Sequence, residues 1–309
     1  MKAIRVHEFG GPEVLKYEEA PRPEPAPDEV LIKVYASGVN PVDWKMRAGL
    51  AESLFPINLP FIPGWDVSGE IEQVGSDILI FKKGDEVYGR PDVTRDGTYA
   101  EFVAVKADQI NFKPKSIDHD KAAAVPLAGL TAWQGLFNYG KLEEGQKVLI
   151  HAASGGVGSF AVQLAKWKGA RVIGTASEEN IDFLFDLGAD GAIDYKNQKF
   201  EDKITGVDLV LDLVGGDIQK RSLKVIKKGG RLITTVQPRY QEEAKAKGIH
   251  IEAFLTKSLP EELQQLADLI DSGKIKPIVS QKFALKDAAA AQIEIEKGHT
   301  RGKIVLTVV

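Results

Sequence analysis

The sequence contains no cysteine, so disulfide bonds, thiolate nucleophiles and cysteine-bearing zinc sites are all excluded. Any metal ion would have to be held by His, Asp or Glu. The five histidines are scattered along the 309 residues, without the close spacing that places two imidazoles on one face of a helix. We therefore expect no bound metal ion.

Long apolar runs and blocks of like charge are also missing. No stretch approaches the roughly eighteen apolar residues that span a bilayer, and the first residues lack the apolar segment of a signal peptide. Acids and bases are interspersed, with a formal net charge of -4. Such a surface favours neither nucleic acid nor a membrane as a partner. We expect a cytoplasmic protein that acts on a small molecule.

The pattern of apolar residues predicts an α/β protein with two domains. Short runs rich in Val, Ile and Tyr, separated by Gly, Pro and Asp, predict a partly closed β-barrel in residues 1–117. Strands and helices then alternate through residues 118–273, which predicts a doubly wound parallel sheet. The apolar strand that ends the chain predicts that residues 274–309 return to the first domain. Within the alternation we expect a helix over residues 217–230 and a strand over residues 231–236.

The run "KVLIHAASGGVGSFAVQLAK" has the pattern of a buried strand, a glycine-rich turn and a helix. In a dinucleotide-binding fold, Gly155 would let the backbone approach the pyrophosphate, and Gly158 would let the helix pack closely on the strand. Ala153 stands where the first glycine of the usual motif is found. The alternative is a turn whose glycines serve helix packing alone.

The end of the second strand of this domain bears on the choice between NAD and NADP. An acid there would bind the ribose 2'-hydroxyl of NAD, but the sequence places Ala176 and Ser177 at this point. Ser177 could donate to a 2'-phosphate and Tyr195 could close over it, which favours NADP. Glu178 and Glu179 oppose this preference unless they are solvated acids of a helix's first turn.

A third feature, "GVNPVDWK", sets three polar side chains at the end of a predicted strand. Asn40 could bond the cofactor or an acceptor oxygen, Lys45 could place a cation near developing negative charge, and Asp43 could pair with Lys45 or another base. The alternative is that Asn40 and Asp43 cap a short helix and that Lys45 is solvated. Three aromatic residues could line an apolar acceptor pocket or pack in the core, namely Phe61, Trp65 and Trp133.

Eight segments of the chain, in this order, resemble motifs of the medium-chain dehydrogenase/reductase superfamily. They read "GVNPVDWKMRAG", "PFIPGWDVSGEIEQVG", "GDEVYG", "GTYAEFVAV", "AAAVPLAGLTAWQGL", "VLIHAASGGVGSFAVQLAK", "LGADGAIDY" and "GHTRGKIVLTV". The chain is most similar to the zinc-independent quinone oxidoreductase branch, including NADP-dependent alkenal and enone reductases. The resemblance implies a Rossmann-type domain, a discontinuous GroES-like β-barrel domain and a homodimer.

The resemblance also implies that the zinc of other relatives is missing here. Their zinc is held by a Cys, by a His in a "GHE" turn and by a third ligand. The matching positions in this chain are Asn40, Trp65 and the neighbourhood of Leu127, none of which supplies the same ligation.

The same resemblance implies which residues bind NADP. They would contact the pyrophosphate, the adenosine phosphate, the ribose and the nicotinamide, and the last of them belong to a loop that would close the cleft. The implied residues are Thr131, Ser154, Gly155, Gly156, Val157, Ser177, Tyr195, Val214, Val236, Phe254, Leu255, Arg301, Gly302 and Lys303.

Taken together, these features predict an NADPH-dependent reductase of quinones or of the conjugated C=C bond of enones and alkenals. Hydride addition to such an acceptor develops an enolate, which hydrogen-bond donors can stabilise without a metal. Asn40, Asp43 and Lys45 are the candidate catalytic residues. Two alternatives stay open: a dinucleotide-binding sensor or structural protein without useful catalysis, and a zinc-dependent alcohol dehydrogenase.

Overall fold

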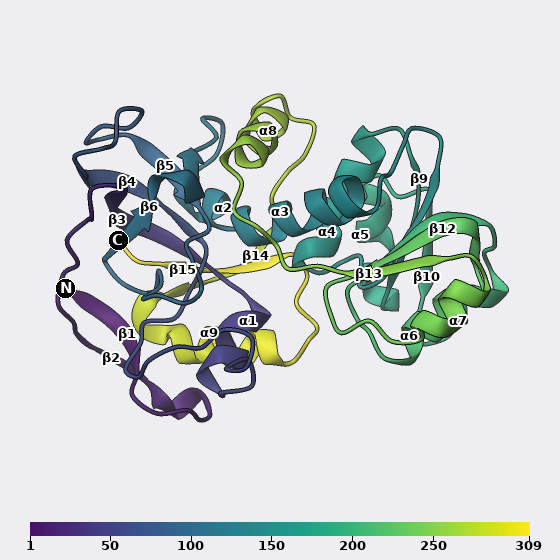
Figure 1. The fold of residues 1–309 in the computed structure, drawn as a ribbon, viewed down its shortest axis with the longest axis horizontal. Helices are drawn as coiled ribbons and strands as arrows, with labels where there is room; N and C mark the ends of the chain where they lie inside the picture. The colour runs from purple at the N-terminus through teal and green to yellow at the C-terminus, as the bar shows by residue number, and fades with distance from the viewer. The chain divides into compact units, whose positions relative to one another are not determined.

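The computed structural model describes residues 1–309, which divide into two compact units (Figure 1). The barrel unit contains residues 1–127, 258–273 and 277–309, and the sheet unit contains residues 128–257 and 274–276. No helix has the length and apolar character needed to cross a membrane. The α/β class and the discontinuous first domain agree with the sequence analysis.

The boundaries between the units differ from those expected. Helices α2 (His119–Ala123) and α8 (Pro260–Asp271) lie in stretches that we expected in the sheet domain, yet both belong to the barrel unit. The reason is packing: α2 lies against the barrel strands, and the Tyr88 hydroxyl, from the same strands, donates to the Leu263 carbonyl of α8 at 2.5 Å.

The barrel unit is built on one seven-stranded sheet with strand order β14-β15-β3-β4-β5-β7, and β6 also pairs with β3. All of these pairs are antiparallel except that of β14 with β15. A two-stranded sheet and two further helices, α1 and α9, complete the unit. The bounds are β1 (Lys2–Val6), β2 (Leu15–Glu19), β3 (Glu29–Val39), α1 (Pro41–Arg47), β4 (Val67–Val74), β5 (Glu86–Gly89), β6 (Phe102–Lys106), β7 (Ile110–Phe112), β14 (Val279–Ala284), α9 (Ala288–Glu296) and β15 (Lys303–Thr307).

Buried β-branched side chains hold this sheet together. Val30, Ile32 and Val34 alternate along β3 and pack with Ile71 and Val87 from the neighbouring strands, and all five are inaccessible to solvent. The alternation sends every second side chain of β3 into the core, as expected for a strand with period two. The long central strand β3 is therefore a rigid support for the residues at its end.

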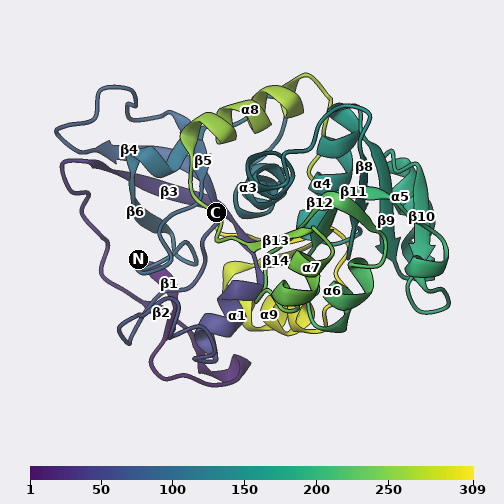
Figure 2. The same cartoon turned by 45° about the vertical axis from the view of Figure 1, so that its right-hand side comes forward.

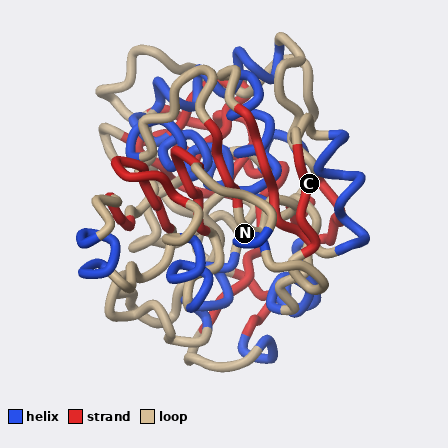
Figure 3. Tube along the Cα trace, turned by 90° about the vertical axis from the view of Figure 1, so that its right-hand side faces the viewer, coloured by secondary structure: helices blue, strands red, loops and turns tan.

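The sheet unit is a six-stranded parallel sheet with strand order β10-β9-β8-β11-β12-β13 (Figure 2). The order reverses between β8 and β11, which is the arrangement of doubly wound dinucleotide-binding folds. Figure 3 distinguishes the helices and strands along the trace by colour. The bounds are α3 (Pro126–Trp133, whose first two residues belong to the barrel unit), β8 (Lys147–Ile150), α4 (Gly156–Trp167), β9 (Arg171–Ala176), α5 (Ile181–Asp186), β10 (Gly191–Asp194), β11 (Val207–Asp212), α6 (Asp217–Ser222), β12 (Ile226–Thr234), α7 (Gln241–Ala246) and β13 (His250–Ala253).

The expected helix over residues 217–230 is wrong in its second half. Helix α6 ends at Ser222, and β12 begins at Ile226, five residues before the expected start of the strand. Ile226 is buried and pairs with Val207 of β11, and the register then shifts before Leu209. Burial against the sheet therefore outweighs the helical pattern of the sequence.

Candidate active site

Three polar residues from distant parts of the chain meet at the end of β3. Asn40 follows directly after this strand. Strands β4 and β15 flank β3, and both run antiparallel to it, so each begins where β3 ends. Asp66 directly precedes β4, and Lys303 is the first residue of β15. The strand pairing thus brings Asn40, Asp66 and Lys303 together, and we call these three residues the polar cluster.

The polar cluster is buried and closely hydrogen-bonded. The Asp66 Oδ2 atom accepts bonds from Asn40 Nδ2 at 2.8 Å and from Lys303 Nζ at 3.0 Å. Lys303 Nζ also donates to Asn40 Oδ1, and the Leu127 backbone N–H donates to Asp66 Oδ1 at 2.6 Å. The exposed fractions are 3% for Asn40, 0% for Asp66 and 3% for Lys303. An acceptor on one side and a donor on the other fix the orientation of the Asn40 amide.

Gly38 makes room for this arrangement. A Cβ atom at Gly38 would lie 2.6 Å from Asp66 Oδ2 and 2.5 Å from the Ala123 carbonyl oxygen. No side chain fits in that space, so a glycine is needed one position before the end of β3 for Asp66 to reach the other two residues of the cluster.

Asp43 supports the loop that carries Asn40. Its Oδ2 atom accepts bonds from the Asn40 backbone N–H at 2.8 Å and from the Tyr99 hydroxyl at 2.7 Å. Burial raises the pKa of Asp43 to about 7, although these two donors and the Lys303 cation oppose the rise. Asp43 therefore holds the start of α1, as the capping alternative proposed.

Lys45, the other predicted catalytic residue, is not the partner of Asp43. Its side chain is exposed, and its ammonium lies 5.7 Å from the centroid of the Trp44 ring. The cation beside Asn40 is Lys303, which the sequence analysis named only as part of a loop that closes the cleft.

The aromatic residues proposed to line an acceptor pocket are buried. Phe61 and Trp65 belong to an apolar cluster of the barrel unit, with exposed fractions of 1% and 0%. In the sheet unit, Trp133 is buried against Phe137, with ring centroids 4.8 Å apart in an edge-on contact. All three side chains therefore pack in the core, as the alternative to a pocket lining proposed.

In the sheet unit, the predicted cofactor residues follow the carboxyl ends of neighbouring strands. Because the six strands are parallel, these ends meet at one edge of the sheet. The strand order reverses between β8 and β11, and ligands of such folds bind at the carboxyl ends next to this reversal. The loops at this edge and the first turn of α4 contain most of the predicted set, namely Ser154, Gly155, Gly156, Val157, Ser177, Tyr195, Val214, Val236, Phe254 and Leu255.

The glycine loop after β8 has the shape that a phosphate group requires. Gly155 directly precedes α4, and a Cβ atom there would meet nothing closer than the Ala152 carbonyl oxygen at 3.4 Å. The backbone is thus open to a ligand at the start of a twelve-residue helix, whose free N–H groups favour anions. Gly158 is different, because its Cβ would lie 2.3 Å from the same carbonyl oxygen.

These two glycines give a matched pair of substitutions. Gly158→Ala should lower the unfolding free energy of the sheet unit by about 1–3 kcal/mol, because the methyl group has no space between helix and strand. Gly155→Ala should leave that free energy almost unchanged, since its φ of -76° suits alanine and its surroundings are open. Denaturant unfolding of both variants checks this, and an equal loss in both would contradict it.

Ser177 and Tyr195 are neighbours, because β9 and β10 pair side by side and Tyr195 N donates to the Ala176 carbonyl at 3.1 Å. The Ser177 hydroxyl donates to Glu179 Oε1 at 2.7 Å. Ser177 therefore does not offer its proton to a phosphate in this arrangement. Glu178 and Glu179 are exposed acids in the first turn of a short helix (Glu178–Asn180), as the solvated alternative expected, and Glu179 also accepts from Ser177. Tyr195 is 48% exposed at the same sheet edge.

Asp212, at the end of β11, organises the loop that carries Val214. Its Oδ1 atom accepts from the backbone N–H groups of Val214 at 3.0 Å and Gly215 at 2.9 Å. Its Oδ2 atom accepts from Gln219 at 3.0 Å and from Thr234 at 2.9 Å. Sequence reasoning missed this residue. The sequence signal that could have identified Asp212 is an acid at the end of a predicted strand, shortly before two glycines.

The remaining predicted cofactor residues are distributed between the two units. In the sheet unit, the Thr131 and Thr256 hydroxyls bond at 2.7 Å, and Phe254 stacks on Tyr139 with centroids 4.6 Å apart. In the barrel unit, Arg301 is exposed, and Gly302 has the left-handed φ of 62° that allows the turn into β15.

His151 is a buried titratable group directly before the glycine loop. Its ring nitrogens lie 3.1 Å from the Thr175 hydroxyl and 3.0 Å from the Ser222 hydroxyl. Burial lowers the pKa of His151 to about 4. A neutral imidazole can donate to one hydroxyl and accept from the other, so His151 links β8 to β9 and α6 without charge.

Asp43 and His151 should give the two units opposite pH dependence. Folding raises the pKa of Asp43 from 3.8 to about 7, so the unfolding free energy of the barrel unit should fall between these pH values as pH rises. Folding lowers the pKa of His151 from 6.5 to about 4, so the unfolding free energy of the sheet unit should rise between about pH 4 and 6.5 as pH rises. The unfolding free energy should change by at most about 4 kcal/mol in the barrel unit and about 3 kcal/mol in the sheet unit.

Hydrogen exchange, corrected for the intrinsic pH dependence of exchange, measures each unit separately. Asp43→Asn should abolish the fall in the barrel unit, and His151→Gln should abolish the rise in the sheet unit. Slopes that survive these substitutions would show that other groups are responsible.

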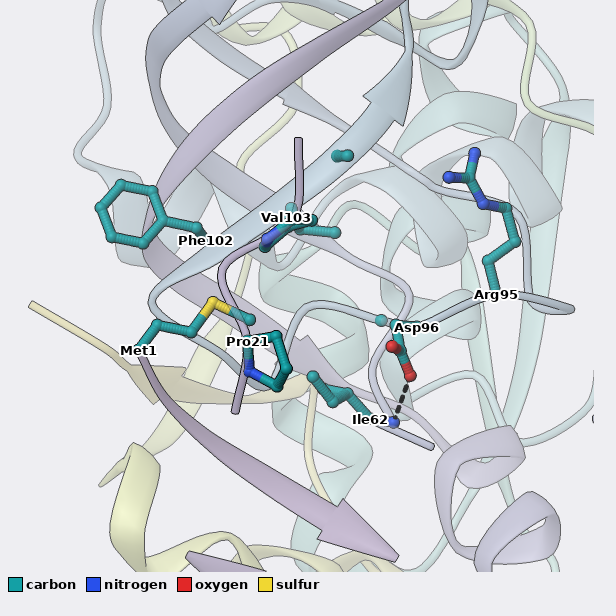
Figure 4. A pocket seen from close by; sticks show the side chains of 10 residues that line it. Met1, Pro21, Ile62, Arg95, Asp96, Phe102 and Val103 are labelled. Carbon is teal, nitrogen blue, oxygen red and sulfur yellow. Dashed lines mark hydrogen bonds between the residues drawn. The ribbon is translucent and has the colours of Figure 1, made fainter. Parts of the chain in front are cut away.

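A cavity of about 180 Å³ lies elsewhere in the barrel unit (Figure 4). The Asp96 carboxylate on its wall accepts a bond from the Ile62 N–H at 2.8 Å. This volume is below the roughly 300 Å³ at which small-molecule pockets usually begin. No predicted site residue is among its lining residues, which are Met1, Pro21, Pro23, Ile62, Arg95, Asp96, Gly97, Phe102, Val103 and Ala104.

Potential metal ligands are not clustered. No three side chains among the His, Asp and Glu residues are arranged to hold a metal ion. In the polar cluster, a lysine ammonium lies beside the only carboxylate, that of Asp66.

Known proteins resemble the chain over its whole length. A family model described as an alcohol dehydrogenase GroES-like domain matches residues 26–115, and one described as a zinc-binding dehydrogenase matches residues 187–306. The quinone oxidoreductase of Mus musculus is 38% identical, over 99% of this chain and 97% of its own. The NADPH-dependent alkenal/one oxidoreductase of Arabidopsis thaliana chloroplasts is 36% identical, over 99% of this chain and 79% of its own.

Solved structures show the same likeness. The structure of the quinone oxidoreductase from Coxiella burnetii superimposes with a TM-score of 0.94. That protein is 39% identical in sequence, and the match covers 100% of this chain and 99% of the other.

Proposed function

Because this chain belongs to the medium-chain dehydrogenase/reductase superfamily, within its quinone oxidoreductase branch, we propose that it uses NADPH to reduce quinones or the conjugated C=C bond of enones and alkenals. The observation that carries the proposal is the open backbone at Gly155, which directly precedes helix α4 at the carboxyl edge of a parallel sheet. This is the site at which such folds bind dinucleotides.

The residues at this edge fit a nicotinamide dinucleotide. Ser154 to Val157 would hold the pyrophosphate, and the loops that carry Val214, Val236 and Phe254 would hold the ribose and nicotinamide. When bound, the reduced nicotinamide supplies a hydride. We propose that Thr131, Leu255, Arg301 and Gly302 complete the cofactor site.

Three features of the sheet unit support the proposed preference for NADP. The position that carries an acid in NAD-binding folds is Ala176, and Tyr195 is exposed beside it. Lys196 is also exposed and directly follows Tyr195, so it could offer a cation to the 2'-phosphate. The Ser177 hydroxyl is less suited to this role because it already donates to Glu179. We propose that Tyr195 and Lys196, more than Ser177, bind the 2'-phosphate.

The chain's own groups would orient the acceptor and stabilise its oxygen. We propose that Asn40 donates a hydrogen bond to the acceptor, that Asp43 holds the Asn40 loop, and that the exposed Lys45 interacts with the cofactor. Hydride addition to the β-carbon of an enone gives an enolate, and a proton from water at the α-carbon completes the reduction.

Oxidation of NADPH and of NADH should be followed with three acceptors: 2-cyclohexen-1-one, a benzoquinone and, as the control, cyclohexanone. We expect oxidation with at least one of the first two and none with cyclohexanone, and faster oxidation of NADPH than of NADH. Tight NADPH binding without turnover of any acceptor would instead support a sensor or structural protein.

Zinc independence is tested by metal removal. Dialysis against a chelator should leave the rate of NADPH oxidation unchanged, because the polar cluster places an ammonium beside its carboxylate. Loss of the rate, restored by added zinc, would favour the zinc-dependent alcohol dehydrogenase instead.

We further propose a cytoplasmic homodimer. The edge strand β13 pairs only with β12, which leaves its other side for a second copy. Light scattering coupled to size-exclusion chromatography should give twice the mass of the 33.7 kDa chain.

A further inference from the structure

We infer that Lys303 and Asn40 together bind the carbonyl oxygen of the acceptor, and that Asp66 is the positioning residue that holds them. This inference rests on the proposed function and identifies which groups would recognise the acceptor. It assigns the cation of the site to Lys303, which lies beside Asn40, in place of the exposed Lys45.

The count of hydrogen bonds in the polar cluster leaves donors to spare. An ammonium has three N–H bonds, and Lys303 uses two of them, on Asn40 Oδ1 and Asp66 Oδ2. The Asn40 amide has two N–H bonds. One is directed to Asp66 Oδ2 at 2.8 Å, and the other has only the Gly38 carbonyl, at 3.5 Å. One N–H of Lys303 and one weakly engaged N–H of Asn40 thus remain.

Each oxygen of the polar cluster already accepts at least one hydrogen bond. Asp66 is completely buried, and its two oxygens accept three hydrogen bonds in total, from Asn40, Lys303 and Leu127. Asn40 Oδ1 accepts from Lys303. A ligand that reaches the cluster therefore meets N–H donors, which suits a carbonyl oxygen better than the hydroxyl proton of an alcohol.

The electrostatics of the cluster also suit an oxygen that gains negative charge. The charges of Lys303 and Asp66 balance, and their fixed geometry needs no rearrangement when an enolate forms. In the proposed step, a C–H bond of the reduced nicotinamide would break and its hydride would form the new C–H bond at the β-carbon, which leaves the cofactor oxidised. The C=C π electrons of the acceptor then move toward the carbonyl, and its oxygen becomes the enolate oxygen. The two N–H groups would stabilise that oxygen until water protonates the α-carbon.

Asp66 would act through its neighbours. It lies 26 residues from Asn40 and 237 from Lys303 in the sequence, and it is the only group that bonds to both. A carboxylate in this position sets the orientation of the amide and neutralises the buried ammonium. Asp66 is completely buried, and both Asn40 and Lys303 bond to its Oδ2 atom, so we assign it the role of holding these two residues.

The test is the carbon-13 signal of 2-cyclohexen-1-one labelled at the carbonyl carbon, bound to the protein with NADP+, which cannot donate a hydride. Donation of hydrogen bonds to the carbonyl oxygen moves this signal downfield. We expect a downfield shift with the natural protein, most of it lost in Lys303→Met and part of it lost in Asp66→Asn. Lys282→Met, on the neighbouring strand β14, is the control and should retain the full shift.

If Lys303→Met does not fold, the double variant Asp66→Asn/Lys303→Met replaces it, because it removes both buried charges. A full shift in a folded Lys303 variant overturns the inference. The inference is also overturned if the enone does not bind to the natural protein, or if it binds and its carbonyl signal does not move. The proposed function is judged separately by NADPH oxidation. A protein that reduces enones while the Lys303 variant keeps the full shift would retain the function and lose this inference.

Discussion

Replacement of Asp66 by leucine should lower the unfolding free energy of the barrel unit by about 3–5 kcal/mol, the cost of leaving a buried charge without its partner. Lys303 would keep a positive charge at an exposed fraction of 3%, with only Asn40 to accept from it. The Leu127 N–H would lose its acceptor as well. Denaturant unfolding of the barrel unit, followed by hydrogen exchange, measures the loss.

A double-mutant cycle separates the lost charge pair from the lost packing. Adding Lys303→Met to Asp66→Leu removes the stranded cation, so the double variant should be more stable than Asp66→Leu alone. Asp77→Leu, at an exposed acid after β4, is the control and should change the free energy by less than about 0.5 kcal/mol. Equal stability of the single and double variants would mean that Lys303 is not held as an ion pair with Asp66.

Lys303→Met should have the largest effect on catalysis. We expect kcat for an enone or quinone to fall by about 10²-fold, the usual effect of removing one donor to a developing oxyanion. The KM for NADPH should change much less if Lys303 acts on the acceptor, whereas a role in binding the cofactor would raise that KM. Steady-state kinetics at saturating NADPH and at saturating acceptor distinguish the two.

The matched variants are Lys303→Arg, which keeps a cation, and Lys282→Met. The arginine should recover part of the lost rate, and Lys282→Met should retain the natural rate. An unchanged kcat in Lys303→Met would remove Lys303 from the proposed mechanism.

The position of the proposed cofactor residues at one edge of the parallel sheet could be predicted from sequence because its determinants are local. A strand, the loop from Ala152 to Gly155 and a helix follow one another in the chain, and the parallel alternation then brings Tyr195 and Val214 to the same sheet edge. The roles of single hydroxyls could not be predicted in the same way. The Ser177 proton goes to Glu179 because the turn after β9 folds Glu179 back toward it.

The polar cluster could be predicted only in part, because strand pairing assembles it across the whole chain. Asn40 stood out at the end of a predicted strand, but its partner Lys303 lies 263 residues away. Only the antiparallel pairing of β3 with β15 brings the two together. Asp66 was missed because a single acid before a strand carries no signal of its own. Lys45 was preferred because it is close to Asn40 in sequence, yet helix α1 directs it to solvent.

Hydride transfer to the β-carbon can be followed with NADPH deuterated at C4 of the nicotinamide and 2-cyclohexen-1-one, with a benzoquinone offered in a parallel reaction. The proposed mechanism predicts that the cyclohexanone formed from the enone carries deuterium at the carbon β to the carbonyl and none at the α-carbon. Deuterium on the carbonyl carbon, as in an alcohol product, would contradict it. Failure of both the enone and the quinone to consume NADPH would contradict it as well.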